Sequence, residues 1–181
     1  MNNLATGSKH IKVSRIYLVG FMGVGKSTVG KQLAKILGYK HLDLDAVFEQ
    51  KYKINIDLFF KKYGEALFRE IEYNLLLSTF DLEKVVISTG GGTITTGKAM
   101  NKMVENGFTV YLEMPVGELV HRLSHAKKRR PLVDGKNKAD LAKTIENKLL
   151  ERAPIYSKAH LKLNAADIDA NHLAKLIKEK F

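Results

Sequence analysis

Residues 16–28 read Ile-Tyr-Leu-Val-Gly-Phe-Met-Gly-Val-Gly-Lys-Ser-Thr. The first four form a continuous apolar run, which is typical of a parallel strand that is buried on both faces. From Gly20 to Thr28 the sequence matches the pattern G-x-x-x-x-G-K-[ST] in full, in which the backbone N–H groups of a glycine-rich turn surround phosphate oxygens. A helix is expected to begin near Lys26 and to end at Gly38. This order of strand, loop and helix predicts a binding site for ATP or GTP.

The chemistry of the loop depends on its residue types. Lys26 is placed to reach the β and γ phosphates, and the hydroxyl of Ser27 is placed to bind Mg²⁺. The N-terminus of the following helix adds the positive end of its dipole at the same place. We expect the nucleotide to contact Gly23, Val24, Gly25, Lys26, Ser27 and Thr28.

Beyond the loop, short apolar runs alternate with longer stretches of helical periodicity. This pattern indicates an α/β fold in three layers, with helices on both faces of a parallel sheet. Five strands are expected, at residues 16–19, 41–43, 84–88, 108–112 and 161–163. Further helices are expected over about 46–52, 56–63, 65–79, 98–105, 116–123 and 139–157, the last kinked or interrupted near Pro154, and over a closing segment that contains Leu173, Leu176, Ile177 and Phe181.

The remaining segments are polar. Residues 1–13 are unpatterned and are expected to be a flexible tail, so that residues 14–181 form a single domain. Residues 125–138 are dominated by Lys, Arg, Gly and Pro with little to bury, and they are expected to be a mobile surface loop.

Composition narrows the possible functions. The 181 residues include 30 Lys and Arg against 19 Asp and Glu, a net charge of +11, which nucleic acid, an anionic membrane or a small polyanionic ligand could explain. The absence of cysteine excludes disulfides, thiolate metal sites and a cysteine nucleophile. No apolar run approaches the roughly 18 residues of a membrane helix, and residues 1–13 lack the apolar core of a signal peptide, so a cytoplasmic protein is expected.

A candidate acceptor site follows the second predicted strand. In His41-Leu42-Asp43-Leu44-Asp45, polar and apolar residues alternate, so His41, Asp43 and Asp45 are expected to share one face. Ligands of open parallel sheets bind beyond the carboxyl ends of the strands, beside the phosphate loop. One carboxylate there could hold Mg²⁺ and the other could orient or deprotonate an acceptor hydroxyl. The alternative is a solvated loop or a helix cap.

Five motifs follow one another between about Ile16 and Ala159. The phosphate loop is followed by Asp43-x-Asp45, Gly64-Glu65-x-x-Phe68-Arg69-x-x-Glu72, Ser88-Thr89-Gly90-Gly91-Gly92 and Arg130-Pro131-Leu132. With these motifs in this order, the sequence closely resembles the shikimate kinase family. The resemblance implies a fold like that of the nucleoside monophosphate kinases, with strand order 2-3-1-4-5. It also implies Mg²⁺-dependent transfer of the γ-phosphoryl group of ATP to the 3-hydroxyl of shikimate, a step of aromatic amino-acid biosynthesis through chorismate.

The resemblance further assigns roles on the acceptor side, with the substrate-binding helices at about residues 46–79. Arg69 clamps the shikimate carboxylate, and Glu72 holds the guanidinium of Arg69 in place. Arg152 is the second carboxylate-binding arginine. The backbone of Gly91 and Gly92 approaches the ring hydroxyls. Asp45 orients the acceptor hydroxyl.

On the nucleotide side, the resemblance makes residues 125–138 a lid over ATP. Arg130 contacts the transferring phosphoryl group, Ser27 and Asp43 hold the metal, and Arg122 is a loose match to the arginine that stacks on adenine. Lys26 and Arg130 with Mg²⁺ would then stabilise charge in the transition state.

Other functions remain open at this stage: a kinase of gluconate or of a nucleotide, a nucleic-acid-stimulated NTPase, or a nucleotide-binding regulator. Paired arginines and the glycine turn argue against a nucleotide acceptor, and no aromatic-rich basic platform supports nucleic acid. From His121 to Arg152 there are ten Lys and Arg against four Asp and Glu, which fits the steering of small anions. These observations lead us to expect neither nucleic acid nor membrane as a partner. Shikimate is the partner that the family resemblance implies, and we expect a monomer.

Overall fold

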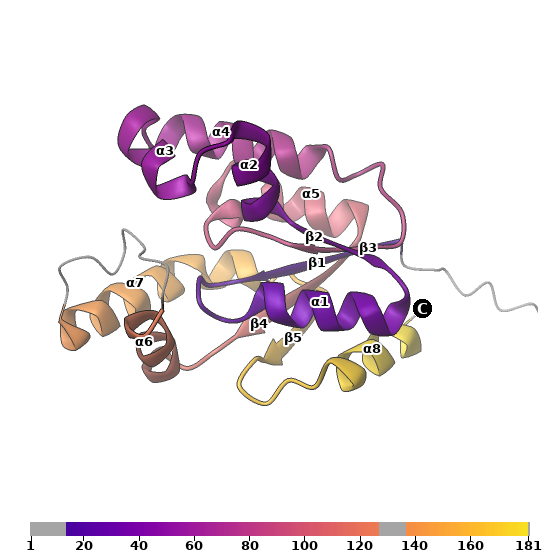
Figure 1. Ribbon diagram of the computed structural model, residues 1–181. Coiled ribbons are helices and arrows are strands. Elements are labelled where there is room, and N and C mark those ends of the chain that lie inside the picture. The colour runs from indigo at the N-terminus through magenta and orange to yellow at the C-terminus, as the bar shows by residue number, and fades with distance from the viewer. Residues whose placement is uncertain (1–13, 127–136, 181) are drawn as a thin grey trace, which may run out of the picture.

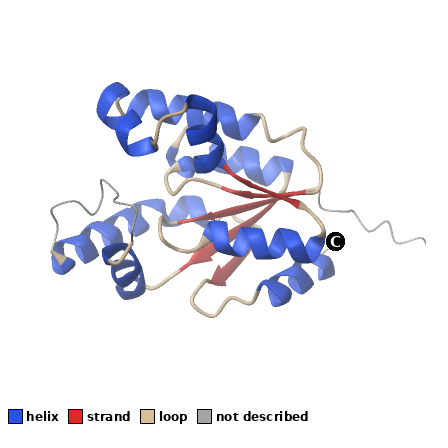
Figure 2. Cartoon of the chain, viewed as in Figure 1, coloured by secondary structure: helices blue, strands red, loops and turns tan. Residues whose placement is uncertain are grey.

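A five-stranded parallel sheet forms the middle layer of the molecule (Figures 1 and 2). The structure is a computed structural model and describes residues 14–126 and 137–180. Its strands are β1 (Arg15–Gly20), β2 (Lys40–Asp43), β3 (Val85–Ser88), β4 (Phe108–Glu113) and β5 (Leu161–Asn164). They pair in parallel in the order β2-β3-β1-β4-β5, which confirms the predicted strand count and the order that the family resemblance implies.

Helices cover both faces of this sheet. They are α1 (Lys26–Leu37), α2 (Leu44–Tyr52), α3 (Ile56–Tyr63), α4 (Glu65–Leu77), α5 (Ala99–Asn106), α6 (Val116–Ser124), α7 (Lys138–Tyr156) and α8 (Ala170–Glu179), with a short 3₁₀ helix η1 (Thr93–Thr95). In Figure 1, α1 and α8 lie on one face and α2 to α5 lie on the other. The predicted three-layer α/β/α architecture is confirmed.

Strand β1 shows why the sheet lies in the centre. Ile16 and Leu18 pack in the core that α1 and α8 share, whereas Tyr17 and Val19 pack in the core of the opposite face. All four side chains are fully buried. A strand that is buried on both faces needs apolar residues at every position, and this requirement explains the continuous run.

The carboxyl ends of three strands meet at one edge of the sheet. Ser88 at the end of β3 pairs in register with Leu18 of β1 on one side and with Asp43 of β2 on the other. Beyond this edge β1 continues into the phosphate loop, β2 into α2 and β3 into the glycine-rich turn of residues 89–92. The topology therefore brings the predicted nucleotide and acceptor motifs together.

The structure corrects the expectation that His41, Asp43 and Asp45 share one face. Strand β2 ends at Asp43 and α2 begins at Leu44, so Asp45 lies in the first turn of a helix and not on the face of a strand. The Asp43 side chain accepts hydrogen bonds from the backbone N of Asp45 and Ala46. This N-cap starts the helix and ends the alternation of polar and apolar residues.

Helix α7 is not interrupted near Pro154, which was one of the two predicted alternatives. It runs without interruption from Lys138 to Tyr156 and contains Pro154. Proline removes one backbone donor, and here the loss falls in the last turn, just before the helix ends.

The tail of residues 1–13 and residues 127–136 of the predicted lid, which include Arg130, lie outside the described residues. Within the described ranges, none of the helices has the length and apolar character needed to cross a membrane.

Candidate active site

The phosphate loop joins β1 to α1 over residues 21–25. Gly25 is the N-cap of α1 with φ of 104°, a left-handed conformation that favours glycine. The buried ammonium of Lys26 donates hydrogen bonds to the carbonyl oxygens of Gly20 (2.8 Å) and Phe21 (3.0 Å). The predicted phosphate-binding cation is thus held against the backbone of the predicted loop.

Two further residues of the first turn of α1 face outward. Ser27 and Thr28 are exposed, and the Ser27 hydroxyl donates a hydrogen bond to Oδ2 of Asp43. Asp43 uses its other oxygen, Oδ1, to cap α2. Asp43 is therefore both the helix cap and the partner of Ser27, and the two predicted metal ligands lie side by side.

The carboxylates of Asp45 and Glu72 meet at the glycine turn. A Cβ built on Gly90 would lie 2.8 Å from Oδ1 of Asp45 and closer still to Oε1 of Glu72. The two carboxylates, one from α2 and one from α4, therefore line the same side of this turn. Any side chain at Gly90 would collide with both of them.

Helix α4 positions Arg69 over an aromatic cluster. Phe68 is buried between Phe48 and Phe60, with ring centroids 4.9 and 4.7 Å away. The guanidinium of Arg69 lies 5.2 Å from the ring centroid of Phe68 and 5.8 Å from that of Phe60. These contacts over the ring faces stabilise the cation and fix its plane.

Two carboxylates bind the same guanidinium. Nη1 of Arg69 donates to Oε2 of Glu72 at 2.6 Å, while Nε and Nη2 donate to Oε1 of Glu65 at 3.1 and 2.9 Å. Burial alone lowers the pKa of Arg69, but the charges and hydrogen bonds of Glu72 and Glu65 outweigh it and the pKa lies above its ordinary value. Arg69 is therefore a fixed cation at any working pH.

The arginines reach the glycine turn from two directions. A Cβ at Gly92 would lie 2.5 Å from Nη2 and 2.6 Å from Nη1 of Arg69. From α7, Nη1 of the buried Arg152 donates to the carbonyl oxygen of Gly91 at 2.9 Å. Its guanidinium also lies 5.5 Å from the ring centroid of Phe21 in the phosphate loop. The structure thus brings together both predicted carboxylate-binding arginines and the predicted glycines.

Arg152 retains a donor for a ligand. Its Nε is buried and has no hydrogen-bond partner among the described residues. A buried unpaired donor is unfavourable by itself, and a bound carboxylate would satisfy it.

The remaining predicted contacts lie on the other side of the loop. On α6, Arg122 donates from Nη1 to the carbonyl oxygen of Val24 at 3.3 Å, and a Cβ at Gly25 would lie 3.5 Å from the same nitrogen. A Cβ at Gly23 would lie 3.0 Å from Leu123. Helix α6 therefore packs directly over the phosphate loop, with Arg122 beside Val24 and Gly25. The adenine stacking expected of Arg122 stays a prediction.

Sequence reasoning missed several neighbours of the site. Glu65 stands one turn before Arg69, and this spacing could have indicated an ion pair. Thr93 donates from Oγ1 to Oε1 of Glu72 at 2.6 Å, and its place directly after the three glycines was a weak signal. Nothing local in the sequence indicated the contact between Phe21 and Arg152, which are far apart along the chain.

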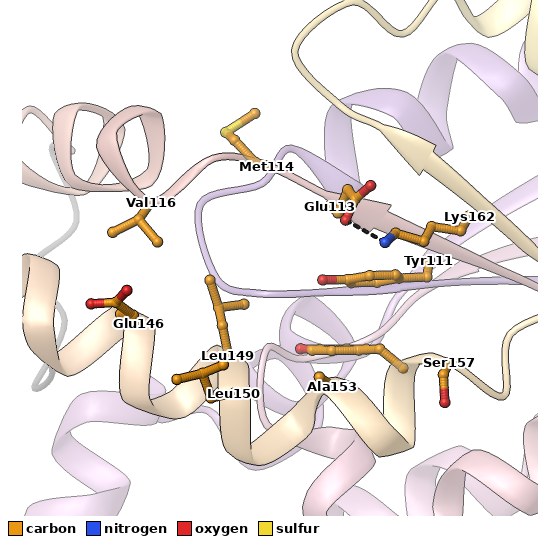
Figure 3. Close-up of a pocket in the computed structure, with 11 residues that line it drawn as sticks. Tyr111, Glu113, Met114, Val116, Glu146, Leu149, Leu150, Ala153, Ser157 and Lys162 are labelled. Carbon is orange, nitrogen blue, oxygen red and sulfur yellow. Dashed lines mark ion pairs between the residues drawn. The ribbon is translucent and has the colours of Figure 1, made fainter.

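A separate cavity of about 340 Å³ lies between α7 and the ends of β4 and β5 (Figure 3). Tyr111 and Tyr156 stack within its wall, with ring centroids 4.2 Å apart, and Lys162 pairs with Glu113 at 2.8 Å. Burial raises the pKa of both phenols, that of Tyr156 to about 12, so both stay neutral. None of the predicted site residues lines this cavity.

The phosphate loop and the acceptor residues lie beyond one edge of the sheet, which is the arrangement of a P-loop kinase. A family model described as "Shikimate kinase" matches residues 22–180. The chain therefore belongs to the shikimate kinase family and is a shikimate kinase. ATP binding and a place in the shikimate pathway are implied by that family.

Relatives and solved structures agree with this assignment. A shikimate kinase of Parabacteroides distasonis is 42% identical over 153 residues, which are 84% of this chain and 88% of that protein. The crystal structure of shikimate kinase from Bacteroides thetaiotaomicron has a TM-score of 0.85 at 36% identity and covers 93% of this chain and 98% of its own. Shikimate kinase from Acinetobacter baumannii in complex with shikimate has a TM-score of 0.82 at 35% identity, covering 93% of each chain.

Proposed function

We propose that this enzyme transfers the γ-phosphoryl group of ATP to the 3-hydroxyl of shikimate, giving shikimate 3-phosphate and ADP on the route to chorismate. The proposal is carried by the convergence of Asp45, Arg69 and Arg152 on the glycine turn beside the phosphate loop. In the reaction, the acceptor oxygen forms a bond to the γ phosphorus while the bond to the β–γ bridging oxygen breaks. The proton of the acceptor hydroxyl must leave in the same process.

The nucleotide side of the reaction uses the loop and α1. Backbone N–H groups of residues 23–28 bind phosphate oxygens, and Lys26 exchanges its carbonyl partners for the β and γ phosphates. Ser27 and Asp43 offer a hydroxyl and a carboxylate side by side, and hard oxygen donors of this kind suit Mg²⁺. When bound, Mg²⁺ neutralises charge on the β and γ phosphates.

Two arginines complete the nucleotide side in this proposal. Arg122, which contacts Val24 of the phosphate loop, stacks on the adenine of ATP. Arg130, in the lid of residues 125–138, neutralises charge on the transferring phosphoryl group.

The acceptor side binds the carboxylate and orients the hydroxyl. Arg69 and Arg152 bind the shikimate carboxylate with planar, forked donors, and Glu72 holds Arg69 in place. Gly91 and Gly92 let the ring approach the backbone closely. Asp45 accepts a hydrogen bond from the 3-hydroxyl and receives its proton as the new bond forms.

The proposal also covers the assembly and the location of the enzyme. We place the enzyme in the cytoplasm as a monomer, with shikimate as its partner and neither nucleic acid nor membrane. The net charge of +11 then steers two anionic substrates towards one site.

A coupled ADP-release assay tests the proposal. Shikimate, gluconate and nucleoside monophosphates are offered with ATP and Mg²⁺, and ³¹P NMR identifies the phosphorylated product. We expect turnover with shikimate alone, and none with Lys26→Ala prepared in parallel to exclude a contaminating kinase. Turnover on gluconate or a nucleotide that exceeds turnover on shikimate would overturn the proposal.

A further inference from the structure

Glu72 is a buried carboxylate whose two oxygens are held by two different parts of the chain. Its side chain is only 3% exposed. Oε2 accepts from Nη1 of Arg69 on the same helix, and Oε1 accepts from Oγ1 of Thr93 in η1, each at 2.6 Å. A buried charge is tolerated only when donors of this kind satisfy it, so both bonds set the orientation of the carboxylate.

Thr93 is fixed by its own surroundings. It is fully buried and directly follows Gly92, and its backbone N donates to the carbonyl oxygen of Gly90 at 3.3 Å. The hydroxyl has that carbonyl oxygen as a second, more distant acceptor, at 3.1 Å. A β-branched side chain has few rotamers available, so the backbone of the glycine turn dictates where this hydroxyl points.

The bond to Thr93 fixes the buried one of the two carboxylates that bind Arg69. Glu72 accepts from Nη1 of Arg69 while Glu65 accepts from Nε and Nη2, but Glu65 is 66% exposed and lies towards solvent. With Oε1 of Glu72 anchored to Thr93, Oε2 stays in place for Nη1 of Arg69. Both terminal nitrogens of Arg69 then face Gly92, as the distances of 2.5 and 2.6 Å to a Cβ built there record.

We propose that Thr93 is a positioning residue for the acceptor: it acts through Glu72 to hold Arg69 in the orientation that binds the substrate carboxylate. The inference rests on the proposed function, in which Arg69 binds shikimate. Without the hydroxyl, the carboxylate of Glu72 can rotate about its last torsion, and Arg69 is then held in place only by the exposed Glu65. The carboxylate substrate is then bound more weakly in the ground state and in the transition state, by the same amount.

The test replaces the hydroxyl by a methyl group in Thr93→Val and compares steady-state kinetics. We expect the KM for shikimate to rise about tenfold, because a hydrogen bond to a charged group is lost. The kcat and the KM for ATP should stay within about twofold, as is typical when ground state and transition state lose the same interaction. Thr93→Ser, which restores the hydroxyl, should return most of the shikimate affinity.

Thr95→Val is the matched control. Thr95 lies in the same 3₁₀ turn and donates its hydroxyl to the carbonyl oxygen of Gly92 at 2.7 Å, whereas the hydroxyl that Glu72 accepts is that of Thr93. Its loss should leave the KM for shikimate within about twofold of the parent value. Equal increases for Thr95→Val and Thr93→Val would overturn the proposal, because they would indicate a general distortion of the turn.

A double-mutant cycle separates action through Glu72 from other effects. In a Glu72→Ala background, which has no side-chain acceptor for the hydroxyl, Thr93→Val should change the KM for shikimate by less than about twofold. A full tenfold effect in that background would overturn the proposal, and so would an unchanged KM in Thr93→Val alone. If Thr93→Val does not fold, the same comparison is made with Thr93→Ala. Failure of the proposed function would show differently, as no shikimate turnover by the parent enzyme.

Discussion

Ser27 donates its hydroxyl proton to Oδ2 of Asp43, so a single hydrogen bond joins the first turn of α1 to the N-cap of α2. Oδ1 of the same carboxylate accepts from the backbone N of Asp45 and Ala46. Asp43 therefore sets the start of the helix that carries Asp45 while it faces the phosphate loop. The nucleotide and acceptor halves of the site share this one residue.

The two roles of Asp43 can be separated by substitution. Asparagine caps helices as well as aspartate does, so Asp43→Asn should change the free energy of unfolding by less than about 0.5 kcal/mol. Because the charge is lost, the Mg²⁺ concentration for half-maximal activity should rise at least about tenfold. Asp169 caps α8 in the same way, accepting from the backbone N of Asn171, and Asp169→Asn serves as the control. A parental Mg²⁺ response in Asp43→Asn would contradict a role in metal binding.

Asp45 is expected to act on the acceptor hydroxyl and not on ATP. Asp45→Asn should lower kcat by about 10²–10⁴-fold, which is the range for loss of a general base, and leave the KM for ATP within about twofold. Asp57 occupies the corresponding first turn of α3, and Asp57→Asn provides a matched control that should keep full activity. Normal turnover by Asp45→Asn would remove this residue from the mechanism.

The local features of this site could be predicted from the sequence. The phosphate loop depends on glycine conformations and on a strand buried on both faces, and both leave a signal in consecutive residues. The secondary structure at Asp45 was harder to predict than the phosphate loop, because two local rules compete there. The alternation from His41 to Asp45 favours a strand, whereas Asp43 is also a favoured helix N-cap, and the cap determines the structure.

The long-range features could not be derived from spacing. Arg152 reaches Gly91 across 61 residues of sequence, and Thr93 reaches Glu72 across 21. These contacts depend on how α7 and η1 pack against the sheet, which no local pattern encodes. The family resemblance could supply a role for Arg152 because Glu151-Arg152-Ala153-Pro154-Ile155-Tyr156 matches the segment of the family's second carboxylate-binding arginine. The resemblance gave no role to Thr93, and only the structure identifies it.

Arg152 should require its guanidinium shape as well as its charge. The guanidinium of Arg152 bonds to the carbonyl oxygen of Gly91 through Nη1 and keeps Nε available for the substrate. Lysine has a single terminal nitrogen and cannot do both, so in Arg152→Lys the KM for shikimate should rise at least about tenfold. Steady-state kinetics with each substrate varied in turn would measure this. Arg15→Lys is the control, because Arg15 also bonds to backbone carbonyls, those of Asn106 and Leu82, at 2.7 Å each. It should lower stability without changing the KM, and an unchanged KM in Arg152→Lys would contradict the assigned role.

His41 should make the stability of the fold depend on pH. Its Nε2 lies 3.0 Å from Oγ of Ser88, whose hydroxyl donates to the carbonyl oxygen of Lys26 at 3.0 Å. Burial lowers the pKa of His41 and the charge of Lys31 adds to this, although Asp43 opposes it. Between the folded pKa and the unfolded value near 6.5, only the unfolded chain binds the proton, so the free energy of unfolding should fall as the pH drops through that window.

Below the folded pKa of His41 no further loss from this group is expected. His41→Gln keeps a donor for Ser88 but cannot titrate, so it should lack this part of the pH dependence. Urea denaturation of both proteins from pH 7.5 to pH 5 measures the difference, and the titrations of the carboxylates and of His160, whose pKa burial also lowers, cancel in the comparison. Parallel stability curves would show that His41 takes up its proton equally well in the folded and unfolded states, against the burial seen here.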